Sequence, residues 1–167
     1  MEEVMSENPI SDALNAIPYG FYALTSRDGD DRNVMVVNWF TQVSFEPQHV
    51  GIGLQVTSYT YGLIEKGQVF GINVFHKDDA EVIKQFTKSR EKNPEKFEAA
   101  NYSDGEVTGV PILDEAAAYM ECEVVGKVET GSGHDMIVGK VVAAGLRKEL
   151  KVEDTLTLPD IGWSYAG

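Results

Sequence analysis

Hydroxyl side chains and a predicted helix start come together in the stretch Thr57-Ser58-Tyr59-Thr60. A short helical pattern follows over residues 61–66 and ends at Gly67. The first N–H groups of a helix have no carbonyl partner within the helix, and serine and threonine hydroxyls add donors beside them. This combination is typical of a site that binds an anion such as phosphate.

A polar strip precedes this stretch on a strand predicted over residues 34–45. The period of two of a β-strand sorts its side chains onto two faces. One face is apolar except for Thr41 and is expected to meet the core: Met35, Val37, Trp39, Val43 and Phe45. The other face starts apolar at Val34 and Val36 and then carries hydrogen-bonding groups beside an aromatic ring: Asn38, Phe40, Gln42 and Ser44.

The next predicted strand covers residues 50–57 and carries glycine on one face only. Its apolar face, which we expect to be buried, consists of Val50, Ile52, Leu54 and Val56. The opposite face consists of Gly51, Gly53, Gln55 and Thr57. Because glycine weakens a strand, two glycines on one face indicate that a flat or bulky group packs closely there.

A basic stretch over residues 84–96 contains five of the 14 basic residues: Lys84, Lys88, Arg90, Lys92 and Lys96. Glu91 and Glu95 lie among them. One interpretation is a solvated helix face and loop. The other is a local positive patch that guides an anionic cofactor to an otherwise acidic protein.

The composition limits the class of protein. The 167 residues, 43% of them hydrophobic, suffice for one domain over residues 1–167, with a flexible arm at residues 1–8. Acidic residues outnumber basic ones by 27 to 14, and the formal charge of −13 disfavours nucleic acid and anionic membranes as partners. With one cysteine, no long apolar run and an acidic start, we expect a soluble cytoplasmic protein.

Strands dominate the rest of the pattern. Further strands are predicted over residues 19–26, 69–75, 118–125, 135–145 and 155–158. Short helices are predicted over residues 12–16, with Ser11 as the cap, and after Asp78, with an apolar stripe of Val82, Ile83 and Phe86. This predicts a mainly β fold with short helices, either a closed antiparallel barrel or a sandwich.

Two features that could hold a metal or do redox chemistry have simpler interpretations. The Asp-rich loop over residues 27–33 lacks the Asp-x-Asp-x-Asp-Gly spacing and the distal glutamate of a calcium loop, so we interpret it as a hairpin connection and predict no metal site. Cys122 falls on an apolar strand face, so we expect a buried small hydrophobe.

The order of these features resembles the flavin reductase-like proteins, especially their flavoredoxin-like members. Besides residues 34–60, the matching segments are Pro18-Tyr19-Gly20-Phe21-Tyr22, Phe70-Gly71-Ile72-Asn73-Val74-Phe75, Gly109-Val110-Pro111-Ile112-Leu113, Ala118-Tyr119-Met120-Glu121-Cys122 and Gly133-His134-Asp135-Met136-Ile137-Val138-Gly139-Lys140-Val141. The resemblance implies an antiparallel Greek-key split β-barrel of the FMN-binding split-barrel type.

The resemblance also implies where a flavin binds. The isoalloxazine ring would lie along Asn38, Trp39, Phe40, Thr41 and Gln42, largely through main-chain groups. The ribityl phosphate would be held by Ser58, Tyr59 and Thr60, with Thr57 at the edge of the pocket. FMN is expected rather than FAD, because the subgroup that this chain most resembles prefers FMN.

Three aromatic or imidazole side chains match family positions near the cofactor. His134 is the candidate catalytic residue, close to the flavin or the nicotinamide, and the alternative is a turn residue that caps a hairpin. The preceding Ser132-Gly133 departs from the acidic residue or threonine that many members carry before this histidine. Trp163 and Tyr165 resemble aromatic residues that cover the cofactor, and a tail that docks on the barrel is the alternative.

We therefore expect an enzyme, an NAD(P)H:flavin oxidoreductase that uses NADH or NADPH. The resemblance implies a homodimer that passes electrons to a small redox protein or to free flavin. Two alternatives remain: a flavoredoxin-like electron carrier with bound FMN and little NAD(P)H activity, and a flavin-free barrel that acts as a dimeric interaction module.

Overall fold

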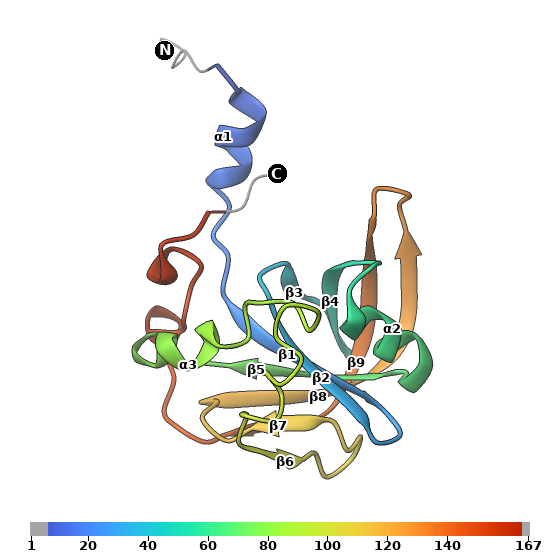
Figure 1. Ribbon diagram of the computed structural model, residues 1–167. Coiled ribbons are helices and arrows are strands. Elements are labelled where there is room, and N and C mark those ends of the chain that lie inside the picture. Colours follow the sequence, from blue (N-terminus) through green and yellow to red (C-terminus); the bar gives the residue numbers. More distant parts are fainter. Residues whose placement is uncertain (1–6, 165–167) are drawn as a thin grey trace.

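A seven-stranded antiparallel sheet forms the body of the molecule (Figure 1). The computed structural model describes residues 7–164, so most of the predicted flexible arm, and Tyr165, lie outside the described residues. The strand order is β2-β1-β5-β8-β9-β4-β3, and β6 and β7 form a separate pair. The predicted mainly β fold with short helices is confirmed. Within residues 7–164, none of the helices has the length and apolar character needed to span a bilayer.

The strands and helices follow one another without long irregular segments, except after α3. The α-helices are α1 (Pro9–Asn15), α2 (Tyr59–Gly67) and α3 (Ala80–Lys84). The strands are β1 (Tyr22–Asp28), β2 (Asp31–Val37), β3 (Phe40–Phe45), β4 (Gln48–Gln55), β5 (Val69–Val74), β6 (Tyr102–Asp104), β7 (Pro111–Leu113), β8 (Ala118–Glu129) and β9 (His134–Leu146). The described part of the chain also has three 3-10 turns: η1 (Lys77–Asp79), η2 (Val152–Asp154) and η3 (Pro159–Ile161).

The sheet is not a closed barrel. Its edge strands, β2 and β3, follow each other in sequence but lie at opposite ends of the strand order. The single strand expected over residues 34–45 is interrupted at Asn38 and Trp39, where the Phe40 N–H donates to the Asn38 carbonyl at 3.1 Å. This tight turn separates β2 from β3 and redirects the chain. The two strands become the opposite edges of a split sheet, so the closed barrel expected from the strand pattern is wrong.

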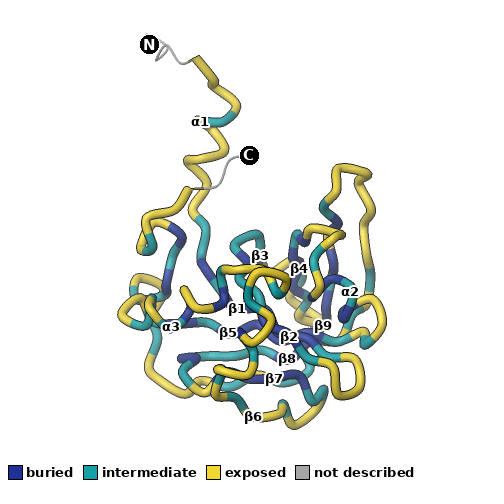
Figure 2. The backbone as a smooth tube through the Cα atoms, viewed as in Figure 1, coloured by how far each residue is buried: buried dark blue, intermediate teal, exposed yellow. Residues whose placement is uncertain are grey.

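Two apolar clusters hold the sheet together (Figure 2). The first lies between the strands and α2, and Ile52, Leu54, Phe70, Ile72 and Cys122 are among its residues. The second lies beneath α3 and the C-terminal segment and includes Phe75, Ile83, Phe86 and Leu156. The predicted burial of Cys122 is confirmed, and burial together with the nearby Glu121 raises the pKa of its thiol to about 12.

Three residues expected in the core lie at the surface. Val43, Phe45 and Val56 are 48%, 87% and 37% exposed. Val43 and Phe45 belong to β3, an edge strand whose outer side has no layer above it within the described chain, and Val56 follows the end of β4. Alternation along a strand identifies its two faces but does not say how far each face is covered.

Several element boundaries also differ from those expected. Helix α1 begins at Pro9, because Asn8, rather than Ser11, is the N-cap and accepts a hydrogen bond from the Ser11 N–H at 3.1 Å. Helix α1 has no buried residue and projects from the sheet (Figure 1). The strand expected over residues 155–158 forms only two isolated bridges, from Thr155 and Thr157.

Candidate functional site

A cavity of about 830 Å3, the main cavity, lies where β2, the start of α2, the loop after α3 and the C-terminal segment meet. The predicted phosphate-binding residues all line it: Thr57, Ser58, Tyr59 and Thr60. Trp163 also lines it. The main cavity therefore unites the anion site expected from the sequence with the C-terminal tryptophan, although about 100 residues separate them.

One end of the main cavity is rich in hydroxyl groups. Ser58 is the N-cap of α2, and its Oγ accepts a hydrogen bond from the Tyr61 N–H at 3.2 Å. Thr60 is buried, and its Oγ1 accepts a hydrogen bond from Asn33 Nδ2 at 2.9 Å. The Ser58 hydroxyl keeps its proton for donation to a ligand, and the first N–H groups of α2 lie beside it.

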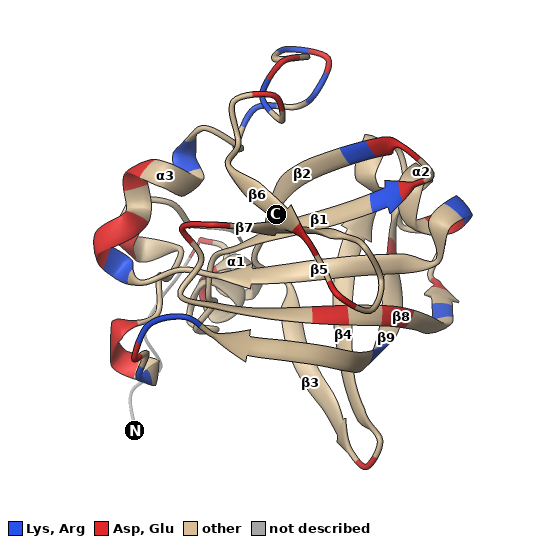
Figure 3. Cartoon of the chain, turned by 90° about the horizontal axis from the view of Figure 1, so that it is seen from below, with Lys and Arg blue, Asp and Glu red and all other residues tan. Residues whose placement is uncertain are grey.

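The loop after α3 carries both basic and acidic residues (Figure 3), and three of its basic residues line the main cavity. Lys88, Arg90 and Lys96 line the main cavity, whereas Lys84 lies outside it and pairs with Glu81 at 2.5 Å. Lys96 is only 4% exposed, and its Nζ donates to the Lys88 carbonyl at 2.8 Å. The interpretation of residues 84–96 as a solvated stretch is therefore wrong for Lys96, whereas Lys84, Lys88 and Lys92 are exposed as it expected.

Lys96 is a buried cation without an anionic partner within residues 7–164. Its burial, together with the neighbouring charge of Arg90, lowers the pKa of the ammonium group to about 8. A buried ammonium bonded only to a carbonyl is costly. An anion in the main cavity would offset that cost.

The predicted ring-binding residues lie apart from the residues that line the main cavity. Trp39 packs over Gly53, where an added Cβ would be 3.3 Å from the Trp39 Cβ, whereas an added Cβ at Gly51 would be 3.2 Å from the Val43 Cγ1. Side chains of the protein itself are therefore the bulky groups beside both glycines. The ring of His134 contacts Trp39 edge to face, with centroids 5.2 Å apart. The candidate catalytic residue therefore adjoins the turn between β2 and β3.

The other predicted ring-binding residues have varied environments. Phe40 packs edge to face on Tyr22 with centroids 5.0 Å apart. The Thr41 and Gln42 side chains are exposed and hydrogen-bond to carbonyls within β3. Asn38 Nδ2 is buried and has no hydrogen-bond partner among residues 7–164, so it is a donor that a ligand could satisfy.

The sequence did not reveal the contacts that link α2 to its neighbours. The Tyr61 hydroxyl donates to Asp135 Oδ2 at 2.6 Å, and Asp135 directly follows His134. Lys127 Nζ pairs with Glu65 at 3.0 Å on the outer side of the same helix. These hydrogen bonds, like the one from Asn33 to Thr60, join residues more than 25 positions apart, and no local pattern announces them.

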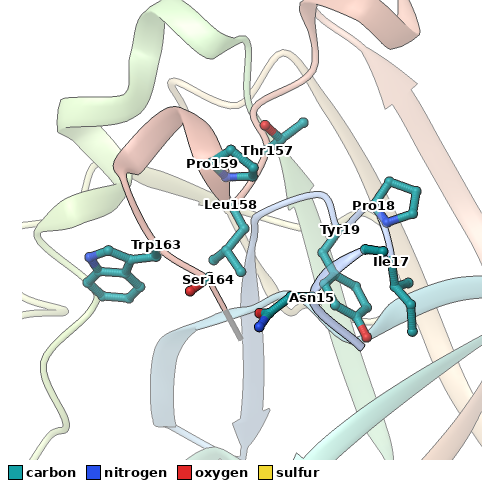
Figure 4. A pocket seen from close by; sticks show the side chains of 10 residues that line it. Asn15, Ile17, Pro18, Tyr19, Thr157, Leu158, Pro159, Trp163 and Ser164 are labelled. Carbon is teal, nitrogen blue, oxygen red and sulfur yellow. The ribbon is translucent and has the colours of Figure 1, made fainter. Parts of the chain in front are cut away.

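A second cavity of about 320 Å3 lies between the base of α1 and the C-terminal segment (Figure 4). Tyr19, Pro18 and Leu158 line it together with Trp163, which also lines the main cavity. Trp163 packs edge to face on Phe21, with centroids 5.9 Å apart. Trp163 therefore docks on the body of the protein and forms a wall of both cavities.

Comparison with known proteins identifies the family. The flavin reductase like domain family matches residues 14–160. The NAD(P)H ferric-chelate reductase of Archaeoglobus fulgidus is 28% identical over 143 residues, which are 84% of this chain and 83% of that protein. The high molecular weight rubredoxin of Moorella thermoacetica is 30% identical over 136 residues, which are 80% of this chain and 58% of that protein.

Other relatives are much longer than this chain. It matches diflavin flavoproteins of Nostoc sp. and Synechocystis sp. and spans about a quarter of their length. Among solved structures, an FMN-binding protein from Thermus thermophilus superposes with a TM-score of 0.75 at 24% identity, over 88% of this chain and 81% of that one. This likeness confirms the split-barrel fold. The match to the family, which covers most of the chain, shows that this protein belongs to the flavin reductase-like domain family.

Proposed function

We propose that this chain is an NAD(P)H-dependent flavin reductase that binds FMN in the main cavity. The observation that carries the proposal is Lys96, a buried ammonium without an anionic partner in the described chain, which lines the same cavity as Ser58 and Thr60 at the start of α2. A phosphate would supply the missing negative charge through charge-assisted hydrogen bonds. The unsatisfied Asn33 Oδ1 and Asn38 Nδ2 are further buried groups that a polar ligand could satisfy.

The residues of the chain would hold and orient the cofactor. Ser58, Thr60 and Lys96 would bind the phosphate together with the first N–H groups of α2. Met35 and Trp163 offer apolar surface in the same cavity. Bound FMN supplies an acceptor for hydride, and hydride transfer needs no acid or base from the protein, so these residues act by positioning.

Residues 38–42 do not line the main cavity, so the ring would have to extend beyond it for its polar edge to contact the turn between β2 and β3. Residues 38–42 contribute main-chain groups, and Asn38 Nδ2 is available as a donor. His134, held against Trp39, is the proposed catalytic residue, where its imidazole could donate a hydrogen bond to the reacting ring.

We further propose that the protein is a cytoplasmic homodimer. Val43 and Phe45 on β3 and Met136 on β9 are exposed apolar side chains that a second copy could cover. The electron acceptor would be a small redox protein or free flavin. A relative named for NADPH-flavin oxidoreductase activity, in Streptomyces viridifaciens, supports the enzymatic proposal.

The alternative is an electron carrier with bound FMN and little NAD(P)H activity. The relatives named as rubredoxin and diflavin flavoproteins favour this second candidate. Both candidates use the same FMN site, so only the source of the electrons distinguishes them.

An absorbance spectrum of the purified protein, followed by anaerobic addition of NADH or NADPH, tests the proposal. We expect flavin absorption bands that bleach when one of the two nicotinamides is added. Bands that persist with both nicotinamides would favour the carrier. A protein that stays colourless and retains no added FMN would refute both candidates and leave a flavin-free interaction module.

The affinity for FMN is expected to fall as the pH rises through about 8. Lys96 loses its charge there, whereas a phosphate monoester is already a dianion above pH 6 or so. Riboflavin carries no phosphate, so its affinity should change less between pH 7 and pH 9.5 or so. Titration of both flavins into the apoprotein at several pH values measures the difference, and parallel curves would contradict a role for Lys96.

Deprotonation of Lys96 lowers the expected affinity for FMN, but it raises the stability of the unliganded fold. The pKa of Lys96 is lowered from 10.5 to about 8, so between these values the unfolded chain holds more protons than the folded chain. Lys96 therefore increases the free energy of unfolding as the pH rises from about 8 to 10.5.

A further inference from the structure

Three side chains from different parts of the chain meet behind the hydroxyl-rich end of the main cavity. Asp31 begins β2, Tyr59 begins α2 and Arg90 lies in the loop after α3. We refer to Asp31, Tyr59 and Arg90 as the Asp31 cluster. Tyr59 and Arg90 line the main cavity, whereas Asp31 is not among its lining residues and contacts both of them.

Hydrogen bonds and stacking tie the cluster together. The Tyr59 hydroxyl donates to Asp31 Oδ2, and Arg90 Nη1 donates to Asp31 Oδ1 at 3.1 Å and to the Arg32 carbonyl at 3.2 Å. The guanidinium carbon of Arg90 lies 4.1 Å from the centroid of the Tyr59 ring, a cation–π contact. The cluster thus joins the β1–β2 hairpin, α2 and the loop after α3 into one wall.

The wall contains a negative charge. Partial burial raises the pKa of Asp31, but the hydrogen bonds from Tyr59 and Arg90 outweigh it, and the resulting pKa is lower than usual. Asp31 is therefore a carboxylate at neutral pH. Because the Tyr59 hydroxyl is bonded to Asp31, the group that Tyr59 can offer to a phosphate in the main cavity is its backbone N–H.

The residues at the start of α2 therefore offer two different kinds of chemical group. Ser58, Thr60 and Lys96 line the same cavity, and their hydroxyl and ammonium groups suit one phosphate group. Tyr59, between them in sequence, supports the wall in front of the Asp31 carboxylate. Tyr59 and Arg90 line the same cavity, so a ligand that continued past the phosphate would meet an aromatic ring and a guanidinium that is paired with the Asp31 carboxylate.

We propose that the Asp31 cluster makes this site select FMN over FAD. The inference rests on the proposed function, because it assumes that the main cavity holds a flavin. In FAD the chain continues through a second phosphate to an adenosine group, which would have to displace Arg90 from Asp31 and bring phosphate charge to a carboxylate. FMN ends at a dianionic phosphate, which matches the ammonium of Lys96 and leaves Arg90 paired with Asp31.

Dissociation constants of FMN, FAD and riboflavin for the apoprotein, measured by fluorescence titration, test this inference. The protein is expected to bind FMN at least about tenfold more tightly than FAD. Tyr59→Ala removes the ring from the wall and should bring the two constants within about threefold of each other. Asp31→Asn keeps the shape and removes the charge, and should narrow the difference by about threefold.

Asp30→Asn is the matched control, because Asp30 is the exposed neighbour of Asp31 in the same turn and lies outside the cluster. It should leave the ratio of the FMN and FAD constants unchanged. Melting curves establish that each variant folds, and Asp31→Asn carries the test alone if Tyr59→Ala does not fold. A protein that binds FAD as tightly as FMN, or an Asp31→Asn variant whose ratio equals that of Asp30→Asn, would overturn the inference. A protein that binds none of the three flavins would overturn the proposed function itself.

Discussion

Lys96→Met is expected to weaken FMN binding about 100-fold and to change riboflavin binding by less than about threefold. A hydrogen bond to a charged group contributes up to about 3 kcal/mol, and only FMN carries the phosphate that Lys96 would contact. Methionine keeps the length and apolar stem of the side chain, so the loop can retain its packing. Titration of each flavin into the apoprotein, monitored by quenching of flavin fluorescence, gives both constants.

The unliganded Lys96→Met variant should also be more stable than the parent. The substitution removes a buried charge whose pKa has moved from 10.5 to about 8, and a gain of about 1 kcal/mol is expected at neutral pH. Lys92→Met is the control, since Lys92 is an exposed lysine of the same loop that does not line the main cavity. Equal losses of FMN and riboflavin affinity, or equal effects of the two substitutions, would place the phosphate elsewhere.

Gly67→Ala and Gly62→Ala are expected to have opposite effects on stability although both lie in α2. A Cβ added at Gly67 would stand 1.8 Å from the Arg27 carbonyl oxygen, so the end of the helix would have to move away from β1. We expect a loss of about 3 kcal/mol. A Cβ at Gly62 meets no atom within 4 Å, and alanine there should stabilise the helix by about 0.5–1 kcal/mol.

Thermal unfolding followed by circular dichroism measures both effects. For a domain of this size, about 3 kcal/mol corresponds to a fall in melting temperature of roughly 6–12 °C. Since α2 carries the proposed phosphate site at its other end, Gly67→Ala should also weaken FMN binding. Equal melting temperatures for the two variants would contradict the close approach of α2 to β1 at Gly67.

The local chemistry of the site could be predicted from the sequence. The sequence predicts a helix start at residues 57–60, and in the structure Ser58 is the N-cap of α2 and Thr60 lies in its first turn, because the rules for helix starts depend on neighbouring residues alone. The burial of Ile52 and Leu54 followed in the same way from alternation along a strand. The resemblance to the flavin reductase-like family predicted the split barrel, because the strand pattern alone is compatible with a closed barrel or a sandwich.

The remaining features depend on contacts between distant residues. The exposure of Phe45 follows from its place on an edge strand, and strand order cannot be read from alternation. The burial of Lys96 follows from the path of the loop back to the Lys88 carbonyl, in a stretch whose composition also suited a solvated surface. The hydrogen bond from Asn33 to Thr60 joins residues 27 positions apart, and no local sequence pattern at either residue predicts it.

The unpaired ammonium of Lys96 also has a consequence for the lifetime of the protein in a cell. A ligand that binds only the folded state raises its stability, and here the ligand would in addition relieve a cost that the empty fold carries. Chains without cofactor should therefore open more often and be degraded faster than loaded ones. The cellular supply of flavin would then set the abundance of the protein as well as its activity.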